Sequence, residues 1–84
     1  MRHADADALD RLDDLIGALR AIPGLVERKR GVFYRRGRAF LHFHDDPAGL
    51  FADVRGDADF DCFEVTTSTQ QRAFLAEARR RASR

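Results

Sequence analysis

Apolar and polar residues alternate between residues 32 and 55, the period of two that is typical of strands with one buried face. Two turn signals interrupt the alternation. Arg36-Gly37 suits a two-residue hairpin loop, because glycine adopts positive φ without steric cost, and Asp-Pro-Ala-Gly at 46–49 has the residue order of a β-turn. The pattern therefore predicts an antiparallel meander with strands at 32–36, 38–44 and 50–55.

The two turns predict which residues face each other. The first turn pairs Phe33 with Phe40, and the second pairs His42 with Asp53. One face is then almost entirely apolar and is the expected core face; it carries Val32, Tyr34, Ala39, Leu41, Phe43, Ala52 and Val54. The second face mixes aromatic and charged residues; it carries Phe33, Arg35, Arg38, Phe40, His42, His44, Phe51, Asp53 and Arg55. A slip of one residue would exchange the two sets.

Helical spacing flanks the meander on both sides. Apolar residues from Leu9 to Ile22 predict a helix that is capped by Asp5 or Asp7 and ends before Pro23-Gly24. A short edge strand at 25–26 and a charged connection at 27–31 lead into the meander. After it come a fourth strand at 60–67, a capping box at 68–71 and a helix to about residue 82.

The alternation in the fourth strand breaks between Cys62 and Phe63, which predicts a bulge there. Together these elements predict one domain over residues 1–84. Its expected fold is a two-layer α+β domain, an antiparallel β-meander of four to five strands flanked by N- and C-terminal helices.

Composition narrows the classes of function. A chain of 84 residues with a single cysteine, Cys62, has no internal disulfide and no four-cysteine zinc site, which suits a reducing cytoplasm. No apolar run is long enough for a membrane helix and no signal sequence is seen, so we predict a cytoplasmic protein with no membrane partner. The formal net charge of +1 gives no general attraction to nucleic acid.

Three short segments resemble the opening half of the MmcQ/YjbR-like family over about residues 15–55. They are Leu-Arg-Ala-Ile-Pro-Gly-Leu-Val-Glu at 19–27, Phe33 with Arg-Gly-Arg-Ala-Phe at 36–40, and Gly49-Leu50. The N-terminal domain of TfoX-type proteins is similar more weakly, as is a luciferase-associated domain with an H-x-H strand. The resemblance supports the meander and implies no catalytic residues; relatives of YjbR have been suspected of binding DNA. The family's aromatic-rich second half is missing after Arg55.

His42, His44 and Asp53 are the candidate metal ligands, because two imidazoles and a carboxylate can hold zinc. The H-x-H-x-D order of metallohydrolases is present, but its final histidine is not. In the alternative interpretation His42 pairs with Asp53 and His44 is solvated at the strand end. We predict no metal and no cofactor on this pattern, and a small metal- or ligand-binding domain through His42 and His44 is the second alternative function.

Residues 36–43 resemble the ribonucleoprotein octapeptide, with Phe40 in a base-stacking position. Phe33 and Phe51 would extend a stacking platform flanked by Arg35, Arg38 and Arg55. Arg38 replaces an expected aromatic residue, and the chain opens with a helix where that fold needs a strand. Nucleic-acid binding is therefore an alternative that the sequence does not favour.

Three phenylalanines on one exposed face instead favour a protein interface, because monomers seldom expose large contiguous apolar patches. The function predicted from the sequence is thus a non-enzymatic interaction module that forms a homodimer or binds a protein partner. The alternative is that the second helix covers this face. We expect no enzyme, because the chain has no Ser-His-Asp order, P-loop or dinucleotide fingerprint. Cys62 with a histidine could form a nucleophilic pair, but a lone cysteine between Phe60 and Phe63 is more typical of the core.

Overall fold

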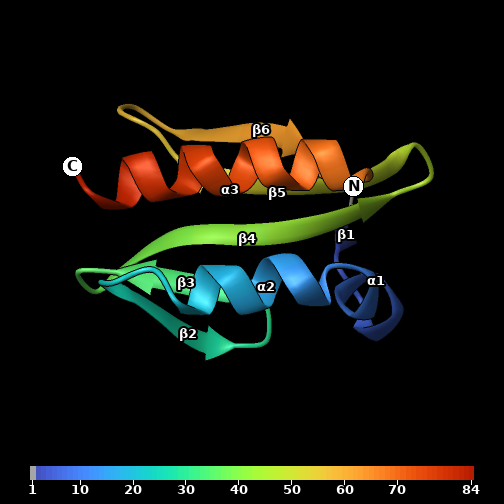
Figure 1. Cartoon of the computed structure of the whole chain (residues 1–84), viewed down its shortest axis with the longest axis horizontal. Helices are drawn as coiled ribbons and strands as arrows, with labels where there is room; N and C mark the ends of the chain where they lie inside the picture. Colours follow the sequence, from blue (N-terminus) through green and yellow to red (C-terminus); the bar gives the residue numbers. More distant parts are fainter. Residues whose placement is uncertain (1) are drawn as a thin grey trace.

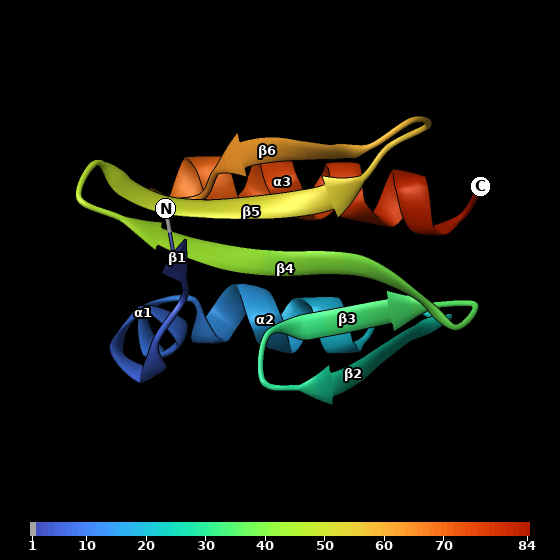
Figure 2. The ribbon, with the colours of Figure 1, turned by 180° about the vertical axis from the view of Figure 1, so that it is seen from behind.

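A single antiparallel sheet with helices on one side forms the two layers of the computed structural model, which describes residues 2–84. Figure 1 shows the helices in front of the sheet, and Figure 2 shows the opposite side, where the strands lie in front. The path through the sheet is β2-β3-β4-β5-β6, and β1 pairs with the end of β4 that β3 does not reach. The predicted α+β class is confirmed. The elements are β1 (Arg2–His3), α1 (Ala6–Arg11), α2 (Asp13–Arg20), β2 (Leu25–Lys29), β3 (Val32–Arg35), β4 (Arg38–Asp46), β5 (Gly49–Arg55), β6 (Phe60–Glu64) and α3 (Ser68–Ala82).

The helix boundaries follow capping chemistry. Asp5 caps α1 by accepting a hydrogen bond from the backbone N–H of Ala8. The single N-terminal helix expected from the sequence is interrupted at Leu12, where α2 begins. The capping box of α3 uses Thr67 and Gln70, so the cap lies one residue before the predicted one.

The charged segment after Leu25 is a strand rather than a connection. β2 extends to Lys29, and Glu27 bonds Arg20 of α2, with 2.5 Å between the carboxylate and Nε. Glu27 also accepts a hydrogen bond from the backbone N–H of Gly31. Glu27 can thus belong to an edge strand on the side of the sheet that faces the helices, because Arg20 and the N–H of Gly31 bind its carboxylate.

A β-bulge at Phe40 overturns half of the predicted register in the first hairpin. Tyr34 pairs with Ala39 as predicted, but Phe33 then pairs with Leu41 and leaves Phe40 as the extra residue. Phe40 and Leu41 are consecutive and both buried, which strict alternation forbids. Beyond the bulge the faces are exchanged: Phe33 is fully buried with the core, and Tyr34 lies on the opposite side.

The β4–β5 and β5–β6 hairpins pair without a bulge, whereas the pairing of β2 with β3 shifts register between Glu27 and Lys29. Leu41 pairs with Val54 and His42 pairs with Asp53, as predicted. The bulge expected between Cys62 and Phe63 is wrong, because β5 and β6 pair continuously. Phe63 packs against Phe74 of α3, so it faces the helices.

The core lies between the sheet and the helices. The predicted burial of Leu41 is confirmed. Among residues 2–84, no helix is both long and apolar enough to cross a membrane. The largest fully buried side chains are Phe33, Phe74, Leu12, Ile16, Leu19, Leu41, Leu50, Val54 and Val65.

Candidate metal centre on the open sheet face

The face of the sheet that points away from the helices is called the open face here. In Figure 2 the strands lie in front of the helices, and no helix of the described chain lies over them. Alternation and strand pairing place the following side chains on it, among others: Val26, Arg28, Tyr34, His42, His44, Phe51, Asp53, Arg55, Phe60 and Cys62.

The second face predicted from the sequence is therefore only partly correct. Its members on β4 and β5 lie on the open face: His42, His44, Phe51, Asp53 and Arg55. Its members at the first hairpin do not, because the bulge turns them toward the helices: Phe33, Arg35, Arg38 and Phe40.

The burial of Phe33 and Phe40 has two consequences. The expected contact of Phe33 and Phe40 with Phe51 is wrong, since Phe51 lies on the other side of the sheet. Phe33 and Phe40 are also too buried to stack on bases, so the predicted platform cannot be built from them, and nucleic-acid binding itself stays a prediction. Arg35, expected to flank it, donates instead to the carbonyl oxygen of Arg84 after α3.

Two histidines and one aspartate converge at the centre of the open face. His42 and His44 are two residues apart on β4 and point the same way, and Asp53 lies across from His42 on β5. Asp53 Oδ2 is 3.2 Å from His42 Nε2 and 2.7 Å from His44 Nε2. The three side chains are only 21%, 17% and 19% exposed, so the expected solvation of His44 is wrong.

His3 and Cys62 border this centre from opposite sides. His3 lies opposite His44 through the pairing of β1 with β4, and their rings stack 5.7 Å apart. Cys62 lies opposite Asp53 on β6; it is exposed rather than part of the core. Every histidine of the chain and its one cysteine thus gather around Asp53.

Aromatic packing fixes the orientation of His42. Its ring meets Phe60 edge-on with 5.2 Å between ring centroids. Phe60 in turn lies 4.7 Å under the guanidinium of Arg55, whose Nε donates to the Ala39 carbonyl oxygen. This packing limits the rotation of the His42 ring.

Burial sets the protonation of two groups at the centre. It lowers the pKa of His42 against the opposing charge of Asp53, which favours the neutral imidazole that binds metal. Burial, and then the hydrogen bond to Asp53, raises the pKa of the Cys62 thiol. A thiol that stays protonated is a weak nucleophile, so the arrangement does not activate Cys62 for catalysis.

The donor atoms have the spacing of a small cation site. Those of His42, His44 and Asp53 all lie within 4.8 Å of one another. Donors around tetrahedral zinc, at bonds of about 2 Å, lie about 3.3 Å apart. Small rotations of the side chains would therefore bring them to ligating distance, with the ion replacing the hydrogen bonds to Asp53.

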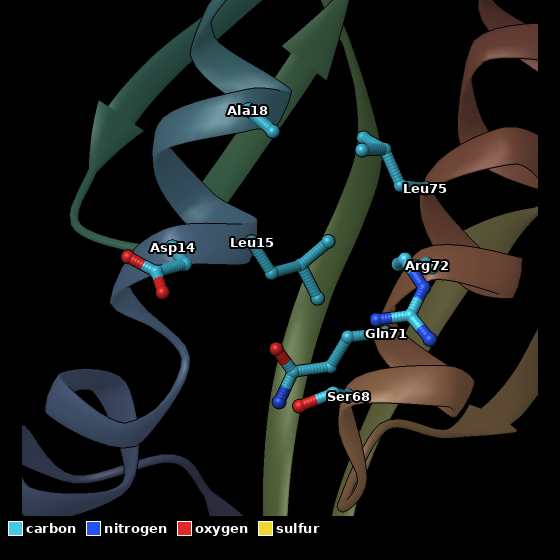
Figure 3. Close-up of a pocket in the computed structure, with 7 residues that line it drawn as sticks. All are labelled: Asp14, Leu15, Ala18, Ser68, Gln71, Arg72 and Leu75. Atoms are coloured by element: carbon cyan, nitrogen blue, oxygen red, sulfur yellow. The ribbon is translucent and has the colours of Figure 1, made fainter.

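A separate groove lies between the helices on the other side of the molecule. Figure 3 shows Leu15 of α2 and Leu75 of α3 pointing into it from opposite sides. Its volume of 240 Å³ is below the roughly 300–1,000 Å³ of typical small-molecule sites. It contains no group of metal-ligating side chains, whereas the open face does.

Comparison with known proteins found no matching family model, no matching curated protein and no matching solved structure. The resemblance to the MmcQ/YjbR-like family thus stays a prediction.

Proposed function

We propose that this protein is a small metal-binding domain that holds one divalent transition-metal ion on its open sheet face. The ligands are His42, His44 and Asp53, and zinc is the first candidate because it favours imidazole and carboxylate in compact sites. The observation that carries the proposal is the convergence of both Nε2 atoms on one oxygen of Asp53. This proposal replaces the sequence-based expectation of no metal.

The position of the ligands supports the proposal. β4 and β5 are central strands, paired continuously from Leu41 to Asp46, so the backbone under the ligands is held on both sides. Sites on regular elements keep their geometry better than sites on loops. Three protein ligands also leave a position for a fourth, as in many zinc proteins.

Calorimetric titration of the full chain with zinc, after treatment with a chelator, tests the proposal. We expect one ion per chain, with the largest NMR shifts at His42 and His44. Asp53→Asn should weaken binding by about tenfold or more, a loss of about 1.4 kcal/mol or more. Asp14→Asn is the matched control. Asp14 is exposed on α2, and its substitution removes the same charge away from the open face. Absence of binding by the wild-type chain would refute the proposal.

A second candidate function is the interaction module predicted from the sequence. What favours it is that Tyr34, Phe51 and Phe60 line the open face and are each partly exposed there. Phe33 and Phe40 no longer contribute to this surface. Light scattering over a range of concentrations tests for a homodimer, and Phe51→Asp should abolish it. A wild-type chain that stays monomeric throughout would exclude self-association.

A further inference from the structure

The N-terminal strand β1 brings the third histidine of the chain to the proposed metal site. Its two residues pair with β4 in the register Arg2 with Asp45 and His3 with His44. Directly paired residues have Cβ atoms about 5 Å apart. His3 therefore lies on the open face, 5.7 Å from the ring of His44 and 6.1 Å from that of His42.

Besides the strand pairing, a backbone hydrogen bond and exposed ion pairs of Arg2 hold β1 in this position. The backbone N–H of Ala4 donates to the Phe43 carbonyl oxygen at 3.2 Å. Arg2 forms an ion pair with Asp45 while its own side chain is 72% exposed. Exposed ion pairs contribute little, about 0–1 kcal/mol. A ligand on β1 would add a further attachment of this short strand to the sheet.

We propose that His3 is the fourth ligand of the ion, so that metal binding fastens β1 to the sheet. This inference rests on the metal-binding function proposed above and goes further, because it completes a three-imidazole, one-carboxylate set suited to tetrahedral zinc. His3 is exposed, and exposed side chains change rotamer within nanoseconds, so its ring can turn from the stack toward Asp53.

The competing fourth ligand is Cys62, which borders Asp53 from β6. The two choices differ in a way that cobalt(II) reports. Cobalt(II) bound by His3 gives the intense visible bands of a four-coordinate site without a sulfur-to-metal charge-transfer band in the near ultraviolet. A Cys62 thiolate ligand would add that band.

Zinc and cobalt(II) titrations of the full chain with matched variants test the inference. His3→Ala should weaken zinc binding by about tenfold or more, measurable by calorimetry. Arg2→Ala is the control, because it removes the ion pair of β1 but no imidazole, and it should bind zinc as the wild type does. Cys62→Ser should also leave affinity unchanged. Circular dichroism checks that each variant is folded.

Hydrogen exchange supplies a second readout that affinity alone does not give. Zinc should slow the exchange of the Ala4 N–H in the wild type and not in His3→Ala, since β1 is fastened only when His3 ligates. If His3→Ala binds zinc as tightly as the wild type, or only Cys62→Ser weakens binding, the assignment of His3 is wrong while the metal-binding function stands. If the wild type binds no zinc, both fail.

Discussion

The covered face and the open face are built from the same strands, yet they use side chains in different ways. On the covered face, residues such as Phe33, Leu41 and Val54 are buried by the helices and contribute through apolar area and shape. On the open face, His42 and His44 are half-buried and both interact with the half-buried carboxylate of Asp53.

The covered face should therefore determine the stability of the fold, and the open face the proposed binding of metal. Removing a buried apolar side chain loses both its transfer free energy and the packing around it. Removing a member of the polar cluster leaves groups that water can reach. Substitutions on the covered face should therefore lower the stability of the fold, and those on the open face should affect binding.

Two phenylalanines test this comparison most strongly. Phe40→Asp should unfold the domain, because loss of a buried Phe costs about 3–5 kcal/mol even without a buried charge, and small domains have little stability to spare. Phe51→Asp, on the open face, should stay folded. Far-ultraviolet circular dichroism distinguishes them, and a folded Phe40→Asp would mean that Phe40 is not a core residue.

A smaller change makes the comparison quantitative. Leu41→Ala should lower the free energy of unfolding by about 2–5 kcal/mol, because Leu41 is 1% exposed in the middle of the sheet. Val26→Ala is the contrasting variant, since Val26 is 58% exposed and should change stability by about 0.5 kcal/mol or less. Urea melts measure both, and equal effects would contradict the separation of the faces.

Metal should make the open face contribute to stability. An ion that binds only the folded chain adds about 2.7 kcal/mol when its free concentration is about a hundred times Kd. For a domain of this size each kcal/mol raises Tm by about 4–8 °C. We expect zinc to raise Tm in the wild type but not in His44→Ala, by differential scanning calorimetry. An equal rise in both would place the ion elsewhere.

The smallest predicted effect concerns an ion-pair cluster on the covered side. Hydrogen bonds from Arg80 and then Arg81 lower the pKa of Glu77 to about 2, from an ordinary value of 4.5. Arg81 also bonds Asp61 and so joins α3 to β6. Because the pKa of Glu77 is lower in the folded state, its stabilisation is complete above pH 4.5 and is lost as pH falls toward 2.

Glu77→Gln should therefore reduce the loss of stability between about pH 5 and about pH 3, measured by urea melts. Asp14→Asn, exposed on α2, is the control and should keep the wild-type acid sensitivity. An unchanged acid dependence in Glu77→Gln would show that this cluster does not act in folding.

The sequence predicted the second hairpin because its alternation is unbroken and Pro47 and Gly49 fit one turn. The pairing of His42 with Asp53 followed directly. The sequence did not predict the bulge at Phe40. A two-residue turn at Gly37 is compatible with an unbroken pairing of Phe33 with Phe40, so nothing in the turn required an extra residue. The two adjacent apolar residues, Phe40 and Leu41, were the available signal. The break in period was instead assigned to β6, where there is none.

The sequence predicted only the part of the candidate metal centre that lies within one hairpin. His42, His44 and Asp53 lie on paired strands, so alternation brought them together. His3 and Cys62 were missed as neighbours of the centre. A two-residue strand such as β1 has no period to detect. The predicted bulge in β6 left the side of Cys62 open, and its single occurrence between phenylalanines favoured a core residue.

The bulge at Phe40 has a consequence for how this chain can change by insertion or deletion. The one extra residue exchanges the two faces of the sheet for the residues that precede it in β3 and β2. Loss of one residue here would turn Phe33 outward and bring Tyr34 and Val26 in, while the histidine half of β4 kept its orientation. The β3–β4 hairpin and the histidine centre thus share β4, but an insertion or deletion at the bulge would change the orientation of the side chains in the hairpin only.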